Sequence, residues 1–208
     1  MGLKERRERE REGRRQQILD AARKLLLEKG LNGASMNQIA QLAELGVATI
    51  YFYYRSKEEL FAALQQEGLE LLHLRIQQAA ARGRSNADKI RRAAQAYLRF
   101  SEENRDYFDI MNYFLSSPGE IFTPDLKRQV DQRGEKILGL VEKLVEDGVR
   151  QGEFGDVDVR NFSLLLWGAL HGLIQFRKMR DTLLVGRNHE RLFRFAVDHL
   201  LSSLSPGG

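Results

Sequence analysis

The stretch "GVATIYFYYRSKEE", residues 46–59, places four aromatic side chains in a row at positions 51 to 54. An α-helix completes a turn every 3.6 residues, so four consecutive side chains point in four directions and cannot all enter one core. Ile50 and Tyr54 are four residues apart and share one helix face, which we assign to the core. Val47, Thr49, Tyr51 and Tyr53 are then expected on other faces, at least partly exposed, and exposed aromatic side chains call for a function.

The residues before this stretch predict a second short helix. Ser35 is followed three residues later by Gln38, the spacing of a capping box at a helix start. The chain breaks near Glu44–Gly46, and a further helix is expected from about Val47 to Tyr54. Two short helices joined by a tight turn over residues 35–54 have the spacing of a helix-turn-helix.

The whole chain of 208 residues is predicted to be all-α, with about nine helices and no strand pattern. Gly30 and Gly33 are expected to end the first helix, Ser56 to cap the fourth, Asn86 the fifth and Asp156 the eighth. Thr123 and Pro124 form the expected start of the seventh helix, after a loop over residues 116–124. The predicted later helices cover residues 57–82, 86–103, 106–115, 124–151, 156–179 and 188–204.

Charge is concentrated at the start of the chain. The net charge is +4, and residues 1–24 hold nine Lys/Arg against five Asp/Glu, which accounts for the whole excess. A basic segment before a neutral body favours contact with nucleic acid. A solvated helix stabilised by pairs such as Glu5–Arg9 is the other interpretation of the same residues.

Several classes of function lack the residues that they need. There is no cysteine, and no two of the four histidines are three or four residues apart, so neither a disulfide nor a helical metal site is expected. We see no Ser/His/Asp set and no glycine-rich phosphate loop, and we therefore expect neither an enzyme nor a cofactor. The longest apolar run, Leu164–Ile174, is too short to span a bilayer, and no export segment precedes the first helix. We expect a cytoplasmic protein without a membrane partner.

The motifs of the first 65 residues together resemble the DNA-binding region of the TetR family of transcriptional regulators. The resemblance is carried by "ILDAARKLLLEKG" (residues 18–30) and "SMNQIAQLAELGVATIYFYYRSKEELFAAL" (residues 35–64). More loosely, "GEFGDVDVRNFSLLLWGALHGLIQF" (residues 152–176) resembles the C-terminal half of some members. Family membership implies a helix-turn-helix domain, expected at residues 1–56, and a helical ligand-binding and dimerisation domain, expected at residues 57–208.

The resemblance also implies which residues contact DNA. Carried over position by position, these are Asn37, Val47, Ala48, Thr49, Tyr51, Tyr53 and, as a phosphate contact, Lys57. Two positions depart from the family pattern. Glu44 stands where many members have Gly, so the turn must avoid or tolerate a positive φ at a non-glycine residue. Val47 stands where a Lys or polar residue is common, and Arg14 and Arg15 could compensate for the lost charge.

The second domain offers a candidate ligand site rich in aromatic residues. Trp167 and His171 are four residues apart and could line one cavity, although a packed core explains the same residues. The expected ligand-binding residues are Tyr97, Phe100, Phe108, Met111, Phe114, Trp167 and His171. Gly168 and Gly172 would let two helices approach closely, and the family pattern implies a homodimer through residues 160–204.

The expected function is a ligand-responsive regulator, most simply a repressor. As a homodimer it would bind a palindromic operator in double-stranded DNA and be released by a small hydrophobic or amphipathic ligand. The alternative is a helical small-molecule-binding protein whose DNA-binding head is weak or inactive. Glu44 and Val47 are the residues that keep this alternative open.

Overall fold

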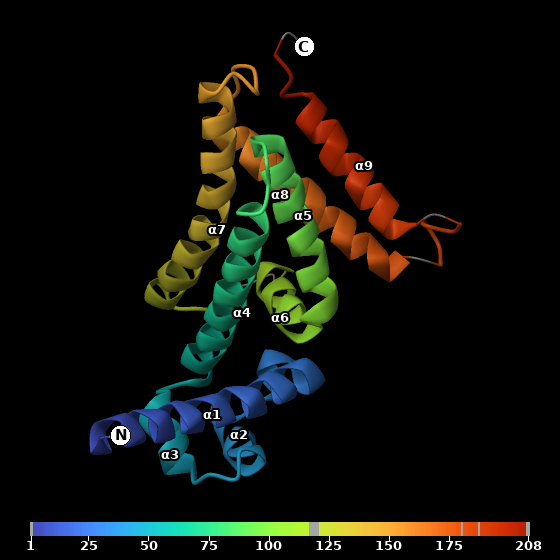
Figure 1. Cartoon of the computed structure of the whole chain (residues 1–208). Coiled ribbons are helices and arrows are strands. Elements are labelled where there is room, and N and C mark those ends of the chain that lie inside the picture. Colours follow the sequence, from blue (N-terminus) through green and yellow to red (C-terminus); the bar gives the residue numbers. More distant parts are fainter. Residues whose placement is uncertain (1, 117–120, 180, 187, 207–208) are drawn as a thin grey trace. The chain divides into compact units, whose positions relative to one another are not determined.

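The computed structural model describes residues 2–116, 121–179, 181–186 and 188–206, without the side chain of Leu3. Within these residues the chain is mostly helical, and turns and short loops connect the helices (Figure 1). The α-helices within these residues are α1 (Leu3–Gly33), α2 (Met36–Leu42), α3 (Val47–Tyr53), α4 (Lys57–Ala80), α5 (Asn86–Glu103), α6 (Arg105–Ser116), α7 (Pro124–Arg150), α8 (Val159–Gln175) and α9 (His189–Ser202), with a 3-10 turn at Phe176–Met179. The prediction of an all-α chain is confirmed. Part of the predicted loop at residues 116–124, namely 117–120, lies outside the described residues.

Two compact units make up the chain. One contains residues 1–69 and 105–132, and the other contains residues 70–104 and 133–208. The first unit therefore combines the helix-turn-helix region with α6, and α4 contributes residues to both units. The predicted boundary between a helix-turn-helix domain at residues 1–56 and a helical domain at residues 57–208 stays a prediction.

The first unit is organised around α1, the helix of 31 residues at its start. Its core-facing side buries Ile18, Ala22 and Leu25, at the helical spacing expected from the sequence. These residues join Ile39 of α2 and Ile50 of α3 in one hydrophobic cluster. Because each short helix contributes only a few apolar side chains, α2 and α3 depend on α1 for their position.

The first helix ends in the predicted stretch, with a kink at Gly30 and its last helical residue at Gly33. Gly30 has a φ of 67° and a ψ of 176°, so the helical path breaks there, but helical residues resume and continue to Gly33. Glycine adopts this backbone conformation with no Cβ penalty, which explains why the kink falls at this residue.

Two predicted helix caps are wrong by one or two positions. The hydroxyl of Ser85, not Asn86, accepts the hydrogen bond from the Asp88 backbone at the start of α5. Asn86 instead donates its backbone N–H to Glu153, at 2.7 Å. At α8 the cap is Asp158 rather than Asp156, and it accepts from Asn161 N at 2.9 Å.

The second unit holds α5, α8 and α9 in mutual contact. His189 at the start of α9 is joined through its Nε2 to the carbonyl of Leu173 on α8, at 2.7 Å. Arg91 of α5 pairs with Asp198 of α9, at 2.7 Å. Across the described residues, we find no helix with the length and apolar character needed to cross a membrane.

Candidate functional site

The helix-turn-helix begins with the predicted capping box at Ser35. The Ser35 hydroxyl accepts a hydrogen bond from the Gln38 backbone at 3.3 Å, and the Gln38 side chain accepts one from the Ser35 backbone at 3.1 Å. Both orphan donors at the start of α2 are thereby satisfied. Asn37, which precedes Gln38, is left exposed on the outer surface of α2, where a ligand can reach it.

The turn between α2 and α3 tolerates a left-handed residue. Glu44 has a φ of 54°, a conformation that costs a non-glycine residue about 1–2 kcal/mol. The turn is held on both sides: the Leu45 backbone donates to the carbonyl of Ala40 at 2.9 Å, and Gln17 of α1 donates to the carbonyl of Ala43 at 2.7 Å. The strain at Glu44 is therefore accommodated by α1.

The inner face of α3 is fixed by Ile50 and Tyr54, both of which are buried as predicted. Tyr54 caps the C-terminal end of α3, and its hydroxyl accepts a hydrogen bond from Nε of Arg15, at 3.0 Å. Burial raises the pKa of the Tyr54 phenol, so this hydroxyl stays neutral at physiological pH. The contact ties the end of α3 to the basic part of α1.

The outer face of α3 carries exposed aromatic side chains. Tyr51 is 50% exposed and Phe52 is 77% exposed, and Ala48 is exposed one turn before Phe52. Phe52 meets the edge of the Tyr53 ring, with the ring centroids 5.4 Å apart. The exposed apolar side chains of Phe52 and Ala48 can contact thymine methyl groups, and the hydroxyl of Tyr51 can bind a base edge or a phosphate.

Four of the predicted DNA contacts are less accessible than Tyr51. Val47 and Tyr53 are partly buried against the core of the first unit, and Thr49 is half-buried. The ammonium of Lys57 donates to the carbonyl of Leu31 at 3.1 Å, so a phosphate would have to share or displace that bond. The assignment of these residues to DNA stays a prediction.

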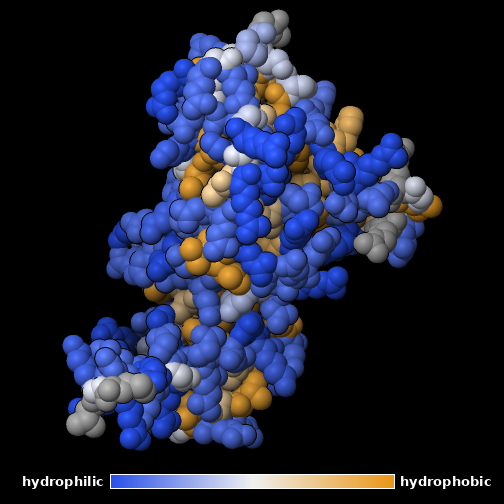
Figure 2. Space-filling model, viewed as in Figure 1, coloured by the Kyte–Doolittle hydropathy of each residue, from blue (hydrophilic) through white to orange (hydrophobic). Residues whose placement is uncertain are grey.

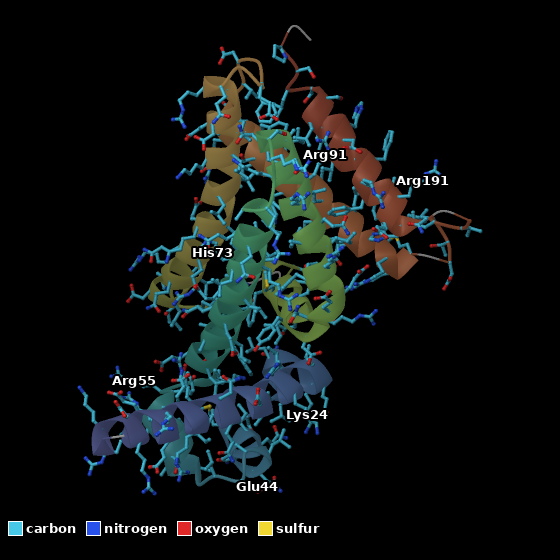
Figure 3. The ribbon with its side chains drawn as sticks, viewed as in Figure 1. Lys24, Glu44, Arg55, His73, Arg91 and Arg191 are labelled. Atoms are coloured by element: carbon cyan, nitrogen blue, oxygen red, sulfur yellow. The ribbon has the colours of Figure 1, made fainter. Side chains whose placement is uncertain are left out.

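Phe52 is the exposed residue that the sequence reasoning left out. It lies two positions from Ile50, and at 100° per residue the two side chains point in nearly opposite directions. Periodicity alone could therefore have placed Phe52 at the centre of the outer face. Figure 3 shows the charged residues on either side of α3, with Glu44 in the turn before it and Arg55 just after it.

The predicted ligand-binding residues divide between the two units. Tyr97, Phe100, Trp167 and His171 belong to the second unit, and Phe108, Met111 and Phe114 belong to the first. Phe114 packs against the core of the first unit, with its ring centroid 4.6 Å from that of Phe122. The structure thus brings only part of the predicted set together, and the assignment of the whole set to a ligand stays a prediction.

Tyr97, Trp167 and His171 form one cluster within the second unit. The hydroxyl of Tyr97 and Nδ1 of His171 share a hydrogen bond of 2.7 Å, and the rings of Trp167 and His171 have centroids 6.0 Å apart. Burial lowers the pKa of His171, which favours its neutral form.

A separate hollow in the second unit lies between α5 and α9. Its volume is about 300 Å³, and it is lined by Arg91, Arg92, Gln95, Phe193, Arg194, Val197 and Asp198. None of the predicted ligand-binding residues lines it. No group of three or more His, Asp or Glu residues suited to a metal ion occurs in the described part of the chain.

A three-helix head with an aromatic outer face on its third helix, followed by a helical unit, defines a helix-turn-helix DNA-binding transcriptional regulator. Residues 18–64 match the description "Bacterial regulatory proteins, tetR family", and residues 90–200 match "Tetracyclin repressor-like, C-terminal domain". The chain belongs to the TetR family.

Known proteins agree with this assignment. The chain is 26% identical over 145 residues to the HTH-type transcriptional regulator YhgD of Bacillus subtilis, covering 70% of this chain and 74% of YhgD. It resembles the structure of the TetR family regulator PfmR from Thermus thermophilus, with a TM-score of 0.71, 25% identity and 90% and 98% of the two chains covered. The structure of FadR from Bacillus subtilis in complex with stearoyl-CoA gives a TM-score of 0.77 at 18% identity, with the same coverage.

Proposed function

We propose that this regulator is a homodimeric repressor that binds a palindromic operator and is released by a small hydrophobic or amphipathic ligand. The observation that carries the proposal is the outer face of α3, where Tyr51 and Phe52 are exposed opposite the buried Ile50. In a dimer, two such helices enter successive major grooves about 34–36 Å apart. The operator is then a palindrome whose half-sites have that spacing.

The head has the features of an active DNA-binding domain. Val47, which lacks the charge common at its position, packs partly into the core instead of facing outward. Glu44 is accommodated in a turn that α1 supports through Gln17. The two departures that favour an inactive head are therefore compatible with a correctly built helix-turn-helix.

Dimerisation is supported by the outer surface of α8 and α9. Leu164, Leu165 and Phe195 are exposed, and a Cβ added at Gly168 or Gly172 would meet no atom within 4 Å. An exposed apolar surface with glycines at helical spacing allows a second helix to approach closely. A second copy of the chain, packed through residues 160–204, would cover this surface.

Ligand release requires different ligand affinities in two conformations of the dimer. A ligand that prefers the released conformation tenfold at each of two sites shifts the equilibrium by about 2.8 kcal/mol. The Tyr97–Trp167–His171 cluster supplies an aromatic environment with polar atoms. Three residues separate the end of α3 from the start of α4, and α4 continues into the second unit. It therefore connects the proposed ligand domain covalently to the helix-turn-helix.

The test is selection of bound duplexes from a random pool by purified protein at about 150 mM salt, because unspecific binding is weak at that ionic strength. Recovery of one palindromic motif supports the proposal. Recovery of no motif favours the alternative, a small-molecule-binding protein with an inactive head. Stearoyl-CoA, which is bound in the FadR structure, is then a probe of the amphipathic class. Release of the recovered duplex by this probe would support a ligand of that kind.

A further inference from the structure

The start of α1 extends beyond the core that the rest of the helix covers. Residues 4–15 are all exposed, and the first buried residue of α1 is Ile18. Figure 2 shows the hydrophilic surface of this segment at the lower left. A helical extension of this length is marginal in isolation, and it contributes no buried side chain to the core of the first unit. It is therefore expected to serve a contact with another molecule.

Three arginines of this extension lie on the same side of α1 as the residues that are buried later in the helix. The positions that share this side are Arg7, Arg11, Arg14, Ile18, Ala21 and Leu25, spaced by alternating steps of four and three residues. The last three of them are buried in the core of the first unit. The basic stripe, defined here as Arg7, Arg11 and Arg14, therefore continues the core-facing side of α1 past the end of the core.

The charges of the basic stripe are not neutralised by the chain. Within the part of the chain that the structure describes, none of its three arginines forms an ion pair. Outside the stripe, Arg6 pairs with Glu10 at 2.9 Å, and Arg9 donates to the carbonyl of Glu5 at 3.4 Å. Glu10 lies within one turn of Arg7 and Arg14, but Arg6 engages its carboxylate, so it forms no ion pair with the stripe.

The chemistry of the extension favours a polyanion over a lipid surface. From position 4 to position 17 the only uncharged residues are Gly13, Gln16 and Gln17, so no apolar face exists to enter a bilayer. Guanidinium groups bind phosphate oxygens through two parallel hydrogen bonds. The stripe also begins next to the helix-turn-helix, because Arg15, the neighbour of Arg14, donates a hydrogen bond to Tyr54 at the end of α3.

We propose that the basic stripe binds backbone phosphates of the DNA that flanks each half-site. This inference rests on the proposed function, since it needs α3 to occupy the adjacent groove. Arg7 and Arg14 are seven residues apart, about 10 Å along the helix. That distance corresponds to about three base pairs, so the stripe extends the bound region without reading sequence.

The test compares two double variants of the full-length protein on the recovered operator. Arg7→Ala with Arg11→Ala removes two charges from the stripe, and Arg6→Ala with Arg9→Ala removes the same charge from positions outside the stripe. Alanine preserves the helix in both. Binding is measured at several salt concentrations, on a duplex with about ten flanking base pairs on each side and on a duplex trimmed to the half-sites.

On the long duplex, the stripe variant is expected to reduce the slope of log Kobs against log[salt] by about 3.6, which is 0.9 for each of four lost phosphate contacts per dimer. The matched variant is expected to keep the wild-type slope, and the two variants should behave alike on the trimmed duplex. Equal slopes for the two variants on the long duplex would overturn the stripe assignment and leave the regulator proposal intact. If the wild-type protein binds no selected duplex more tightly than random DNA, both the stripe assignment and the regulator proposal are wrong.

Discussion

The helices α3 and α8 both leave large apolar side chains in solvent, but their neighbouring charges differ. On α3, Phe52 is 77% exposed, and Arg55 follows three residues later. On α8, Leu165 is 58% exposed, and residues 161–176 contain no Asp, Glu, Lys or Arg. Exposed apolar groups beside cations suit a groove lined with phosphates, whereas exposed apolar groups in an uncharged segment suit another protein surface.

The comparison shows that exposure alone does not identify the partner of a helix. The glycines add a second distinction: Gly168 and Gly172 of α8 have open space around them, while α3 itself contains no glycine. A helix that packs closely against a helix benefits from small residues, and one that reads bases needs side chains that project. The predictions below test this distinction, beginning with the largest expected effect.

Replacing Leu165 and Phe195 together with Lys is expected to convert the dimer into monomers at micromolar concentration. Four added charges would have to be buried in one symmetric interface, and unpaired buried charges are strongly unfavourable. Operator affinity should then fall by about 100-fold or more, because the two half-sites are no longer bound by one molecule. Sedimentation velocity gives the mass, and a gel-shift titration gives the affinity.

The matched control is Leu115→Lys on α6, a position 54% exposed that lies outside residues 160–204. It should keep the wild-type mass and affinity. A double variant that stays dimeric would place the interface elsewhere. It would contradict the assignment of the exposed apolar side chains of α8 to a protein interface.

On the α3 side, Tyr51→Ala is expected to lower operator affinity about 30-fold. Loss of one favourable base or phosphate contact costs about 1 kcal/mol in each half-site, or about 2 kcal/mol for the dimer. Phe52→Ala should have a similar effect. Both side chains are at least half-exposed, so the thermal unfolding midpoint should change little.

Leu27→Ala, which trims an exposed apolar side chain of α1, serves as the control for Tyr51 and Phe52. Its affinity should match that of the wild type. If neither aromatic substitution weakens binding in a fluorescence anisotropy titration, the outer face of α3 is not the reading surface, and a different role is required for it.

Many features set by neighbours in sequence could be predicted, although the cap of α8 at Asp158 was missed, whereas features set by distant neighbours could not. The capping box at Ser35 and the burial of Ile50 and Tyr54 follow from spacing alone, and the structure confirms them. The cap of α5 was wrong because Asn86 is held by Glu153, a residue 67 positions away, and Ser85 takes the capping role. No local pattern contains that partner.

The candidate sites show the same limit. The hydrogen bond from Lys57 to Leu31 joins residues 26 positions apart, and sequence spacing does not indicate that the ammonium is already engaged. The pairing of Trp167 with His171 lies within one helix and was predictable, whereas the hydrogen bond of His171 to Tyr97 depends on how α5 and α8 pack. Phe52 was within reach of periodicity and was missed because positions were carried over from the family pattern.

The smallest expected effect concerns the turn that precedes α3. Glu44→Gly removes both a left-handed side chain and a negative charge, and Glu44→Gln removes only the charge. If the φ of 54° costs about 1 kcal/mol, the Gly variant should unfold about 3 °C higher than the wild type, and the Gln variant should unfold at the wild-type temperature.

Both Glu44 variants should bind the operator severalfold more tightly, because a carboxylate at the start of the reading helix repels nearby phosphates. Differential scanning fluorimetry and the same gel-shift titration separate the two effects. Equal unfolding midpoints for the two variants would show that the turn bears no strain at this position. Unchanged operator affinity in both Glu44 variants would place Glu44 away from the phosphates. The charge that distinguishes the surroundings of α3 from those of α8 would then come only from the arginines and Lys57 beside α3.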